Sequence, residues 1–566
     1  MGVSLGASSL GIGGVWSVAR AQTIPPSADP SRVLLQPVPS LGQHTIEQEK
    51  LLSARTPDLS PELAGLTFSL HSLTIKGATA FPSSQVAALY KDHIGKTISL
   101  SQLFEILKSV QQLYINEGYT LSKISMPPQS IEGGHIVFDV VEGFVGQVDV
   151  DPSIPKSAMV DDFVQKMMAM KPLNAKSLER MMLVLNDRPA LDVVSVLARP
   201  DGNAPSSGEI KLILQNGIKP EDKKRVSGQI AVDNYGSNYT GTGQVSAGLV
   251  INDTGINVSD LALTTKVTTS IQELRQIGFD YTLPIFGVSG MNWKLSGSTA
   301  RTEPGASLDS IDVIGQSLYV RTGIEYPIIR QRAENLIIGA GFNYKDSETD
   351  ILDSLVANDK IRTIEVEASY DTTDRFKGLN FARLKYTQGL NVMNATKTGE
   401  ANLSRDDGHS EFKKAEASVS RLQSVSRNFD IYAQMQGQYS SSPLLSSEEF
   451  GFGGMGIGRG YDPSEITGDH GISASVEVRY NTSVPRYRLN IQPFAFYDIG
   501  RVWNIDPTDK NKISGASTGV GARFLWDDKL SFGATIAYPL TRNPSSPPKY
   551  ADENGLRFLF NVTNRF

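Results

Sequence analysis

Apolar and polar residues alternate along most of the chain after residue 226, with a period of two. The pattern is clearest in segments 364–370, 429–439 and 472–480, where apolar side chains occupy almost every second position. Successive side chains of a β-strand point to opposite faces, so each segment predicts a strand with one apolar and one polar face. A soluble β-sandwich would give similar strands. Long successive strands with charges on the polar face favour a membrane barrel, with lipid outside and water inside.

Turn residues divide 226–566 into sixteen such segments, an even number, as expected of a closed bacterial barrel. We therefore predict a membrane β-barrel of about 16 antiparallel strands. The last segment alternates from Leu556 to Phe566 and ends on an aromatic residue. A terminal strand of this kind is similar to the insertion signal of outer-membrane barrels, which makes Phe566 a candidate signal residue.

The chain before the barrel predicts two α+β units, at 66–145 and 146–218. In each unit, apolar residues recur at intervals of three and four, which indicates helices with one apolar face. In the first unit we expect a helix at 99–114, closed by Gly118, and strands at 68–75, 119–126 and 136–141. In the second unit we expect helices at 163–170 and 178–185 and strands at 147–150, 193–198 and 209–214.

The first 65 residues predict an exported protein. A small and apolar stretch ends at Ala19-Arg20-Ala21, which fits an A-x-A cleavage site and predicts a signal peptide at 1–21. No Lys or Arg precedes this stretch, and a flexible Gly/Ser tail is the alternative interpretation. Residues 22–65 are rich in Pro and Ser and predict a linker or a short plug segment.

Composition excludes several classes of protein. The chain has no run of about 18 apolar residues, so helical membrane spans are not expected. It contains no cysteine, which excludes disulfides and thiolate metal sites. A net charge of −6 argues against a nucleic-acid partner, which would require a surplus of Lys and Arg.

No motif points to an enzyme. The six histidines are scattered without metal-ligand spacing, so we expect no metal, no cofactor and no catalytic residue. Gly451-x-Gly453-x-x-Gly456 matches a dinucleotide fingerprint in form, but it lacks the strand and helix that such a site needs. The adjacent carboxylates Glu448-Glu449 and Asp527-Asp528 are expected to be solvated loop charges.

Two segments near the C-terminal end carry opposite charges. Arg459 lies in a glycine-rich loop, and Asp498 lies in an alternating strand. In that strand the positions with the parity of Ile499 form the lipid-facing set, so Phe494, Phe496 and Asp498 are predicted to point inward. Arg459 must then either lie in solvent or pair with an anion inside the barrel.

These segments resemble those of a known family. The two α+β units resemble POTRA domains. The stretch from Ser446 to Arg459-Gly460-Tyr461 resembles the sixth extracellular loop of the Omp85 superfamily, closest to the TpsB transporters of two-partner secretion. The strand motif F-x-D-x-G is matched by Phe496, Asp498 and Gly500, and the first-strand signature by Asp233, Asn234 and Gly236. One departure is Gly458, where the family usually has Val.

The resemblance implies an outer-membrane translocator with its POTRA domains in the periplasm. It implies that loop 443–469 folds into the lumen and that Arg459 pairs with Asp498. Expected partners are an unfolded TpsA-type exoprotein, outer-membrane lipid and the barrel assembly machinery. An exposed strand edge can add an extended chain to its sheet. We therefore take strand 119–126, with Tyr119, Leu121 and Ile124, as the candidate substrate-binding edge.

Other functions remain as alternatives at this point. An Omp85-type insertase would assemble other barrels, but it usually carries more POTRA units. A passive porin would lack periplasmic domains of this kind, and a receptor would carry a plug domain. No nucleotide-binding motif is recognised, so transport is expected to use no nucleotide.

Overall fold

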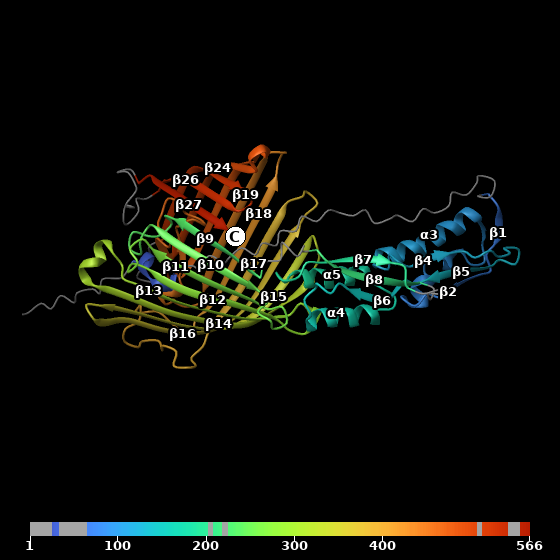
Figure 1. Ribbon diagram of the computed structural model, residues 1–566, viewed down its shortest axis with the longest axis horizontal. Coiled ribbons are helices and arrows are strands. Elements are labelled where there is room, and N and C mark those ends of the chain that lie inside the picture. Colours follow the sequence, from blue (N-terminus) through green and yellow to red (C-terminus); the bar gives the residue numbers. More distant parts are fainter. Residues whose placement is uncertain (1–24, 33–64, 202–207, 218–224, 506–511, 542–554) are drawn as a thin grey trace, which may run out of the picture.

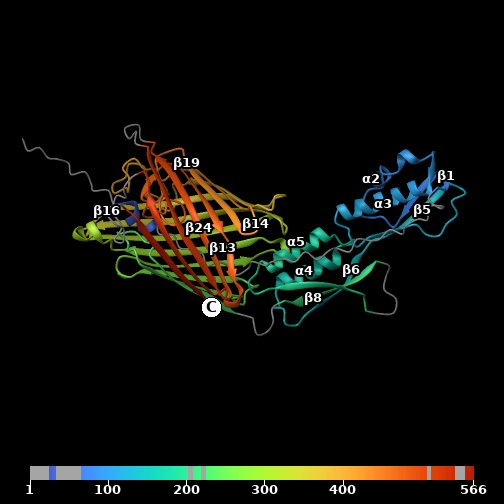
Figure 2. The same ribbon diagram turned by 90° about the horizontal axis from the view of Figure 1, so that it is seen from above.

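The computed structural model describes residues 25–32, 65–201, 208–217, 225–505, 512–541 and 555–566 of the chain. Figures 1 and 2 show a β-barrel at one end and two α+β domains that extend from it in a row. Among the described residues, no helix has the length and apolar character that a membrane crossing requires. The predicted fold class, a barrel preceded by two α+β domains, is confirmed.

The first domain packs one long helix on a small sheet. Its elements are β1 (Thr67–Ser69), β2 (Ser72–Lys76), α2 (Ser83–Ala87), η3 (Lys91–His93), β3 (Thr97–Ser99), α3 (Leu100–Asn116), β4 (Lys123–Ser125) and β5 (His135–Val141). The strands pair in the order β2-β5-β4, and β1 pairs separately with β3. Helix α3 begins at a capping box between Ser99 and Gln102, and Gly118 follows its end with a φ of +94°, as expected of a glycine that closes a helix.

The expected strand at 119–126 is shorter than predicted. Only β4, Lys123–Ser125, is extended, because the chain turns directly after α3. Tyr119 packs against Phe81 in the core of the first domain, with ring centroids 5.5 Å apart. Leu121 instead packs against the core of the second domain, and Ile124 is buried. β4 does lie at the edge of its sheet.

The second domain consists of β6 (Phe144–Val150), α4 (Ala158–Ala169), α5 (Ala175–Asn186), β7 (Val193–Ala198) and β8 (Glu209–Asn216). Its strands pair in the order β6-β8-β7, parallel between β6 and β8. Two valines from the barrel turns, Val258 and Val288, are buried in the same apolar cluster as the residues of α4 and α5. The barrel therefore completes the core of this domain.

Polar contacts fix the second domain to the barrel at the same junction. Arg330, at the end of β14, pairs with Asp187 after α5, with 3.0 Å between the Nε and Oδ2 atoms. The Val288 backbone N–H donates to the Asp162 carboxylate of α4 over 2.8 Å. Hydrophobic and ionic contacts thus act together, and the domain and barrel form a continuous packed unit at this junction.

The barrel strands run antiparallel from residue 226 to the C-terminus. They are β9 (Val226–Asp233), β10 (Gln244–Asn252), β11 (Asp260–Thr268), β12 (Arg275–Pro284), β13 (Asn292–Thr302), β14 (Val313–Arg330), β15 (Glu334–Ile351), β16 (Ser354–Thr373), β17 (Leu379–Gly389), β18 (Lys413–Ser424), β19 (Phe429–Ser440), β22 (His470–Tyr480), β23 (Thr482–Val484), β24 (Leu489–Trp503), β25 (Ile513–Trp526), β26 (Leu530–Pro539) and β27 (Arg557–Arg565). β22 and β23 both pair with β24 and form one interrupted strand, so the described residues make the sixteen strands predicted. Short 3-10 turns, η5 (Gly287–Ser289), η6 (Ala306–Ile311) and η8 (Pro485–Tyr487), lie between strands.

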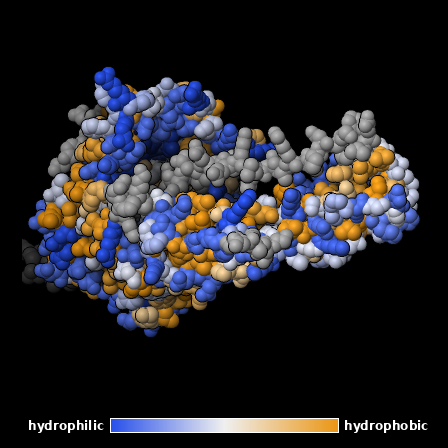
Figure 3. All heavy atoms as spheres, turned by 45° about the vertical axis from the view of Figure 1, so that its right-hand side comes forward, coloured by the Kyte–Doolittle hydropathy of each residue, from blue (hydrophilic) through white to orange (hydrophobic). Residues whose placement is uncertain are grey.

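The alternation of side chains follows the predicted parity. In β24, Tyr497 and Ile499 are exposed on the outer wall, whereas Phe494, Phe496 and Asp498 are buried inside. In β22, Ile472, Val476 and Val478 are likewise exposed on the outside. Figure 3 shows hydrophobic side chains gathered on the outer wall of the barrel. This apolar wall is the surface expected to face lipid.

Candidate functional site: a loop folded into the barrel lumen

Residues 443–469, which we call the lumen loop, connect β19 to β22 and fold back into the barrel. The loop contains a 3-10 turn, η7 (Ser446–Glu448), and a short hairpin of β20 (Phe450–Phe452) and β21 (Ile466–Gly468). Its apolar side chains form a buried cluster with Val502 of β24: Phe450, Phe452, Ile457, Tyr461 and Ile466. This cluster gives the loop a hydrophobic anchor inside the lumen.

Arg459 at the loop tip forms a two-pronged ion pair with Asp498 of β24. Its Nε atom donates to Oδ2 over 2.9 Å, and its Nη2 atom donates to Oδ1 over 2.7 Å. The backbone N–H groups of Gly458 and Arg459 also donate to Oδ2, over 3.0 and 3.1 Å. Both side chains are almost completely buried. Four hydrogen bonds to one carboxylate make Asp498 the main anion that holds the tip of the loop.

A second carboxylate, Glu477 of β22, completes the site. Arg459 Nη1 donates to Glu477, and Nη2 donates to the Ser475 hydroxyl over 3.0 Å. Its guanidinium carbon lies 3.6 Å from the centroid of the Phe496 ring, a cation–π distance. Sequence reasoning predicted Asp498 but missed Glu477, although Glu477 belonged to the inward-facing set of its strand.

Glu477 is also shared with cations of the wall. Arg523 Nη2 lies 3.0 Å from its Oε1 atom, and Arg479 Nε lies 2.8 Å from its Oε2 atom. Arg523 in turn lies over the Phe494 ring, 4.0 Å from its centroid. Charged side chains and aromatic rings thus alternate along this part of the lumen wall, and Arg459 inserts between them.

Glycines permit the close approach of loop and wall. Gly458 has a φ of +97°, which favours glycine over the Val usual in the family, and its N–H is free to reach Asp498. A Cβ atom at Gly500 would lie 2.1 Å from the Phe452 ring, and one at Gly460 would lie 2.7 Å from Ser517. The departure at Gly458 is therefore accommodated by the backbone of this loop.

The residues after Arg459 fix the loop to the last strands. Tyr461 is buried, and its hydroxyl donates to the Ala516 carbonyl over 2.9 Å. Asp462 forms an ion pair of 2.9 Å with Arg557, the first residue of β27, and accepts a hydrogen bond from the Asn238 backbone. The tip of the loop therefore contacts both the β22–β24 wall and the strand that closes the barrel.

The expectation that Glu448 and Glu449 are solvated is wrong. Glu448 pairs with Lys345 of β15 and Lys414 of β18, over 3.0 and 2.8 Å. Glu449 pairs with Arg405 over 3.0 Å, and its side chain is 7% exposed. Both carboxylates are held away from solvent by these cations, because the loop folds inward and carries them with it. Asp528 is exposed in the turn after β25, as expected, whereas Asp527 in the same turn is half-buried and pairs with Arg488.

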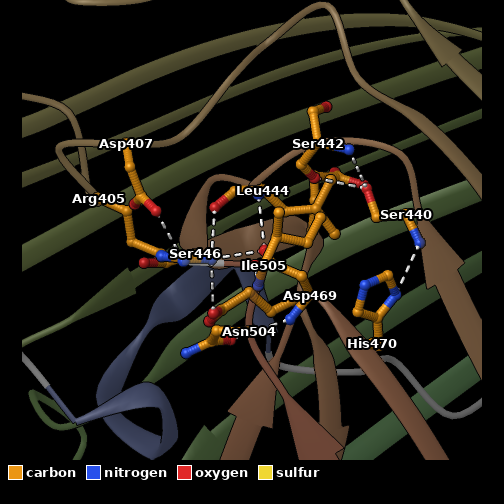
Figure 4. Close-up of polar contacts among 12 residues, drawn as sticks. Arg405, Asp407, Ser440, Ser442, Leu444, Ser446, Asp469, His470, Asn504 and Ile505 are labelled. Atoms are coloured by element: carbon orange, nitrogen blue, oxygen red, sulfur yellow. Dashed lines mark hydrogen bonds and ion pairs between the residues drawn. The ribbon is translucent and has the colours of Figure 1, made fainter. Parts of the chain in front are cut away.

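Asp469 ties the two ends of the lumen loop together. Its Oδ1 atom accepts from the Leu444 backbone N–H and from Arg405, both over 2.7 Å. Its Oδ2 atom accepts from the Ile505 N–H over 2.9 Å, at the end of β24. Figure 4 shows these groups converging on Asp469 from several parts of the chain. Asp469 is completely buried, so these hydrogen bonds hold the two ends of the loop in place.

The first-strand signature lies at the barrel seam. The Asn234 side chain donates to the Phe558 carbonyl over 2.8 Å and accepts from the Phe560 N–H over 2.7 Å. The Asp233 carboxylate accepts from the Tyr235 N–H, and Gly236 pairs with Thr242 through its backbone. Asn234 thereby prolongs the β9–β27 pairing beyond the backbone ladder, which ends at Asp233.

The C-terminal residue also lies at the seam. The Phe566 backbone N–H donates to the Gly228 carbonyl of β9 over 3.0 Å, and Gly228 returns a bond over 3.1 Å. Its side chain stays exposed on the outer surface. Its role as an insertion signal stays a prediction.

Part of the N-terminal segment lies inside the barrel. It forms two 3-10 turns, η1 (Pro26–Ala28) and η2 (Pro30–Arg32). The second turn, η2, contacts β13 and β14 and lines a lumen cavity of about 770 Å³. The Ser237 hydroxyl donates to the Ser27 carbonyl over 2.8 Å. Of segment 22–65, the structure describes the eight residues 25–32, and the plug interpretation stays a prediction. The expected signal peptide at 1–21 lies outside the described residues.

Within the part of the chain that the structure describes, no three His, Asp or Glu side chains are grouped so as to hold a metal ion. The candidate site is instead an assembly of ion pairs between a loop and a wall. Such an arrangement can hold a gate, because ion pairs and hydrogen bonds are broken without changing covalent structure.

Comparison with known proteins agrees with this architecture. The profile described as haemolysin secretion/activation protein ShlB/FhaC/HecB matches residues 209–522, and that of the ShlB-type POTRA domain matches residues 68–143. The heme/hemopexin transporter protein HuxB of Haemophilus influenzae (strain 86-028NP) is 24% identical over 83% of this chain and 82% of its own length. The outer membrane transporter CdiB of Dickeya dadantii (strain 3937) is 20% identical over 86% of each chain.

Solved structures show the same fold. CdiB from Escherichia coli aligns with a TM-score of 0.75 and 19% identity, over 90% of this chain and 93% of that chain. CdiB from Acinetobacter baumannii aligns with a TM-score of 0.63 and 15% identity, over 92% of this chain and 95% of that chain.

A membrane barrel with POTRA-type domains and a loop in its lumen defines an outer-membrane protein transporter. The profile match covers more than half of the chain, and the chain belongs to the ShlB/FhaC/HecB family of haemolysin secretion/activation proteins. It is thus an outer-membrane transporter of two-partner secretion that exports a partner exoprotein, and its POTRA region lies in the periplasm.

Proposed function

We propose that the partner crosses the outer membrane as an unfolded polypeptide through the barrel lumen. The lumen loop closes this path while Arg459 is bound to Asp498 and Glu477, and it opens the path when Arg459 leaves them. The observation that carries the proposal is the burial of a charged loop residue, Arg459, between two carboxylates of the wall.

The energetics favour a gate that is closed at rest. Removing one partner of a buried ion pair costs about 3–5 kcal/mol, because the remaining charge stays desolvated. An exposed pair contributes under about 1 kcal/mol. Opening therefore requires that the free energy of the broken ion pair be offset. Hydration of Arg459 and Asp498 and their contacts with the passing chain provide this offset.

The periplasmic domains receive the partner before it enters the barrel. β4 is an edge strand, and an extended chain can add to such an edge through backbone hydrogen bonds. However, the Ile124 N–H is already bonded by the Gln111 side chain over 3.0 Å, and the side chains of Tyr119, Leu121 and Ile124 pack inward. Binding at β4 would thus use its backbone after Gln111 moves away.

The proposal includes no enzymatic step and no nucleotide. Folding of the partner outside the cell supplies the driving force for its export. The exposed apolar side chains of the outer wall meet membrane lipid, and Phe566 at the end of β27 is the residue that the barrel assembly machinery would recognise.

The test compares secreted proteins in strains of the native host. Deleting the gene should remove a large exoprotein from the medium, as measured by mass spectrometry, and the wild-type gene should restore it. Arg459→Ala should leave the amount of folded barrel unchanged but reduce the exported protein. Arg427→Ala, at an exposed position in a periplasmic turn, serves as the control. Normal export by a folded Arg459→Ala barrel would contradict the gating role.

A further inference from the structure

One carboxylate of the lumen loop is shared by two separate parts of the chain. Glu449 Oε2 lies 3.2 Å from Arg32 Nη2 of the N-terminal segment, and Glu449 Oε1 lies 3.0 Å from Arg405 Nη1 of the β17–β18 loop. The side chains of Arg32 and Glu449 are 8% and 7% exposed. This contact joins the N-terminal segment directly to the loop that closes the lumen.

The balance of buried charge depends on Arg32. Arg405 Nη1 also lies 2.7 Å from the buried Asp469, so Arg405 serves two carboxylates. With Arg32 in place, two guanidinium groups face the two buried anions Glu449 and Asp469. When the N-terminal segment leaves, Arg405 alone remains for both. A buried anion without a full counter-charge is costly, and Glu449 can leave for water whereas Asp469 is fixed at the base of the loop.

The neighbouring residue Glu448 provides a contrast. Its two cations, Lys345 and Lys414, belong to the barrel wall, which does not move with the N-terminal segment. Glu448 therefore anchors the loop whether or not Arg32 is present. Of these two adjacent carboxylates, only Glu449 forms an ion pair with the N-terminal segment.

We propose that Glu449 is a positioning residue that couples the N-terminal segment to the lumen loop, so that withdrawal of either one favours release of the other. The proposal rests on the gating role proposed above for the loop, and it names the contact through which the N-terminal segment takes part in that role. Arg32 stabilises the closed loop through Glu449, and the closed loop retains Arg32 in the lumen. Such coupling is reciprocal. Loss of the contact must therefore raise the rate of loop release and the rate of segment release by the same factor.

The absence of cysteine permits a direct test in the full-length protein. Single cysteines are introduced at Ser31, which lines the lumen cavity, and at Gly456, where a Cβ atom would meet nothing within 4 Å. Gly456 is exposed in the closed structure, so the maleimide is linked to a polymer too bulky to enter the lumen. The rate of modification then reports how often each segment leaves the lumen. Arg32→Gln should raise modification at position 456, and Glu449→Gln should raise modification at position 31, each by at least about fivefold.

The double variant decides between coupling and independent effects. Arg32→Gln with Glu449→Gln should change the rate at position 456 no more than one substitution alone, because both remove the same contact. Effects that multiply in the double variant would overturn the proposal. Glu448→Gln is the matched control, and its effect at position 456 should multiply with that of Arg32→Gln. If the modification rates show no coupling but Arg459→Ala still reduces export, this inference is wrong and the proposed gating role of Arg459 stands.

Discussion

Arg557 Nη2 lies 2.9 Å from Asp462 Oδ1, and the two side chains are 5% and 1% exposed. Asp462 follows the Arg459-Gly460-Tyr461 triplet directly, and Arg557 begins the strand that closes the barrel. The closed loop therefore binds the seam strand as well as the wall formed by β22 and β24. The lumen loop is a structural component of the closed barrel as well as an obstruction.

Asp462→Asn should destabilise the folded barrel by about 3–5 kcal/mol, because Arg557 stays buried without its anion. The temperature at which the barrel loses its compact mobility on detergent gels measures the change. Asp528→Asn, at an exposed turn, should have little effect. Replacing both partners by apolar residues, Asp462→Leu with Arg557→Met, should recover much of the loss. Equal stability of Asp462→Asn and the wild type would show that the pair contributes nothing.

Asn234→Ala should weaken the seam between β9 and β27. The substitution leaves the Phe560 N–H and the Phe558 carbonyl without their partner, at about 1–3 kcal/mol for each group that stays buried. Hydrogen exchange of the Phe560 amide should accelerate, while that of amides in β15 should not change. Asn490→Ala, at an exposed position of β24, is the control. Unchanged exchange at Phe560 would mean that the backbone ladder alone holds the seam.

Arg459→Lys should open the lumen despite keeping the positive charge. A lysine has a single ammonium group, so it cannot make the two-pronged bond to Asp498 together with the contact to Glu477, and it loses the flat stacking on Phe496. Conductance of the purified protein in planar bilayers should rise toward that of Arg459→Ala. Conductance equal to the wild type would show that charge alone holds the loop.

The first periplasmic domain should lose stability in mild acid through Glu142. Burial acts to raise the pKa of this carboxyl, but hydrogen bonds from Thr79, Tyr114 and the Ala80 N–H outweigh burial and lower the pKa below its ordinary value of 4.5. A lowered folded-state pKa means that the carboxylate stabilises the domain above about pH 4.5, and that this stabilisation is lost as the pH falls toward the folded-state pKa.

Hydrogen-exchange protection of β5 and α3 in the full chain, corrected for the intrinsic rate, measures this loss. Glu142→Gln should lower protection at neutral pH and remove the decline that the wild type shows in acid. Glu132→Gln, at an exposed loop position, should keep the wild-type profile. If Glu142→Gln still loses protection in acid as the wild type does, another titrating group causes the loss.

Val288→Ala should destabilise the second periplasmic domain, although Val288 lies in a barrel turn. Its side chain is 2% exposed within the core formed by α4 and α5, and its truncation should cost roughly 1–3 kcal/mol. Hydrogen exchange in α4 should accelerate. Phe286→Ala in the same turn is the control, since Phe286 is 75% exposed. Unchanged exchange in α4 would indicate that the domain folds without the barrel.

The sequence predicted those features that follow from a two-residue period. The inward direction of Asp498 and Phe496 is fixed by their parity with the outward Ile499, and the structure agrees. Glu477 had the correct parity too, but parity does not identify which inward carboxylates meet the loop. That choice depends on the fold of the lumen loop, which brings Arg459 between β22 and β24.

Loops and the N-terminal segment were harder to predict because they have no period. Glu448 and Glu449 look like ordinary surface charges in the sequence, and their burial follows from cations that lie more than 40 residues away in the chain or on other strands. Strand 119–126 was predicted too long because its apolar residues serve two different cores. Contacts between distant segments decided each of these cases.

The two valines contributed by the barrel turns have a consequence for biogenesis. Synthesis delivers α4 and α5 to the periplasm before Val258 and Val288, yet the core of their domain contains both valines. The domain made earlier thus reaches its final packing only after the hairpins that follow it have formed. Final packing of the second periplasmic domain therefore depends on folding of the barrel. A transporter whose barrel is incomplete exposes a periplasmic domain with an incomplete core to its partner protein.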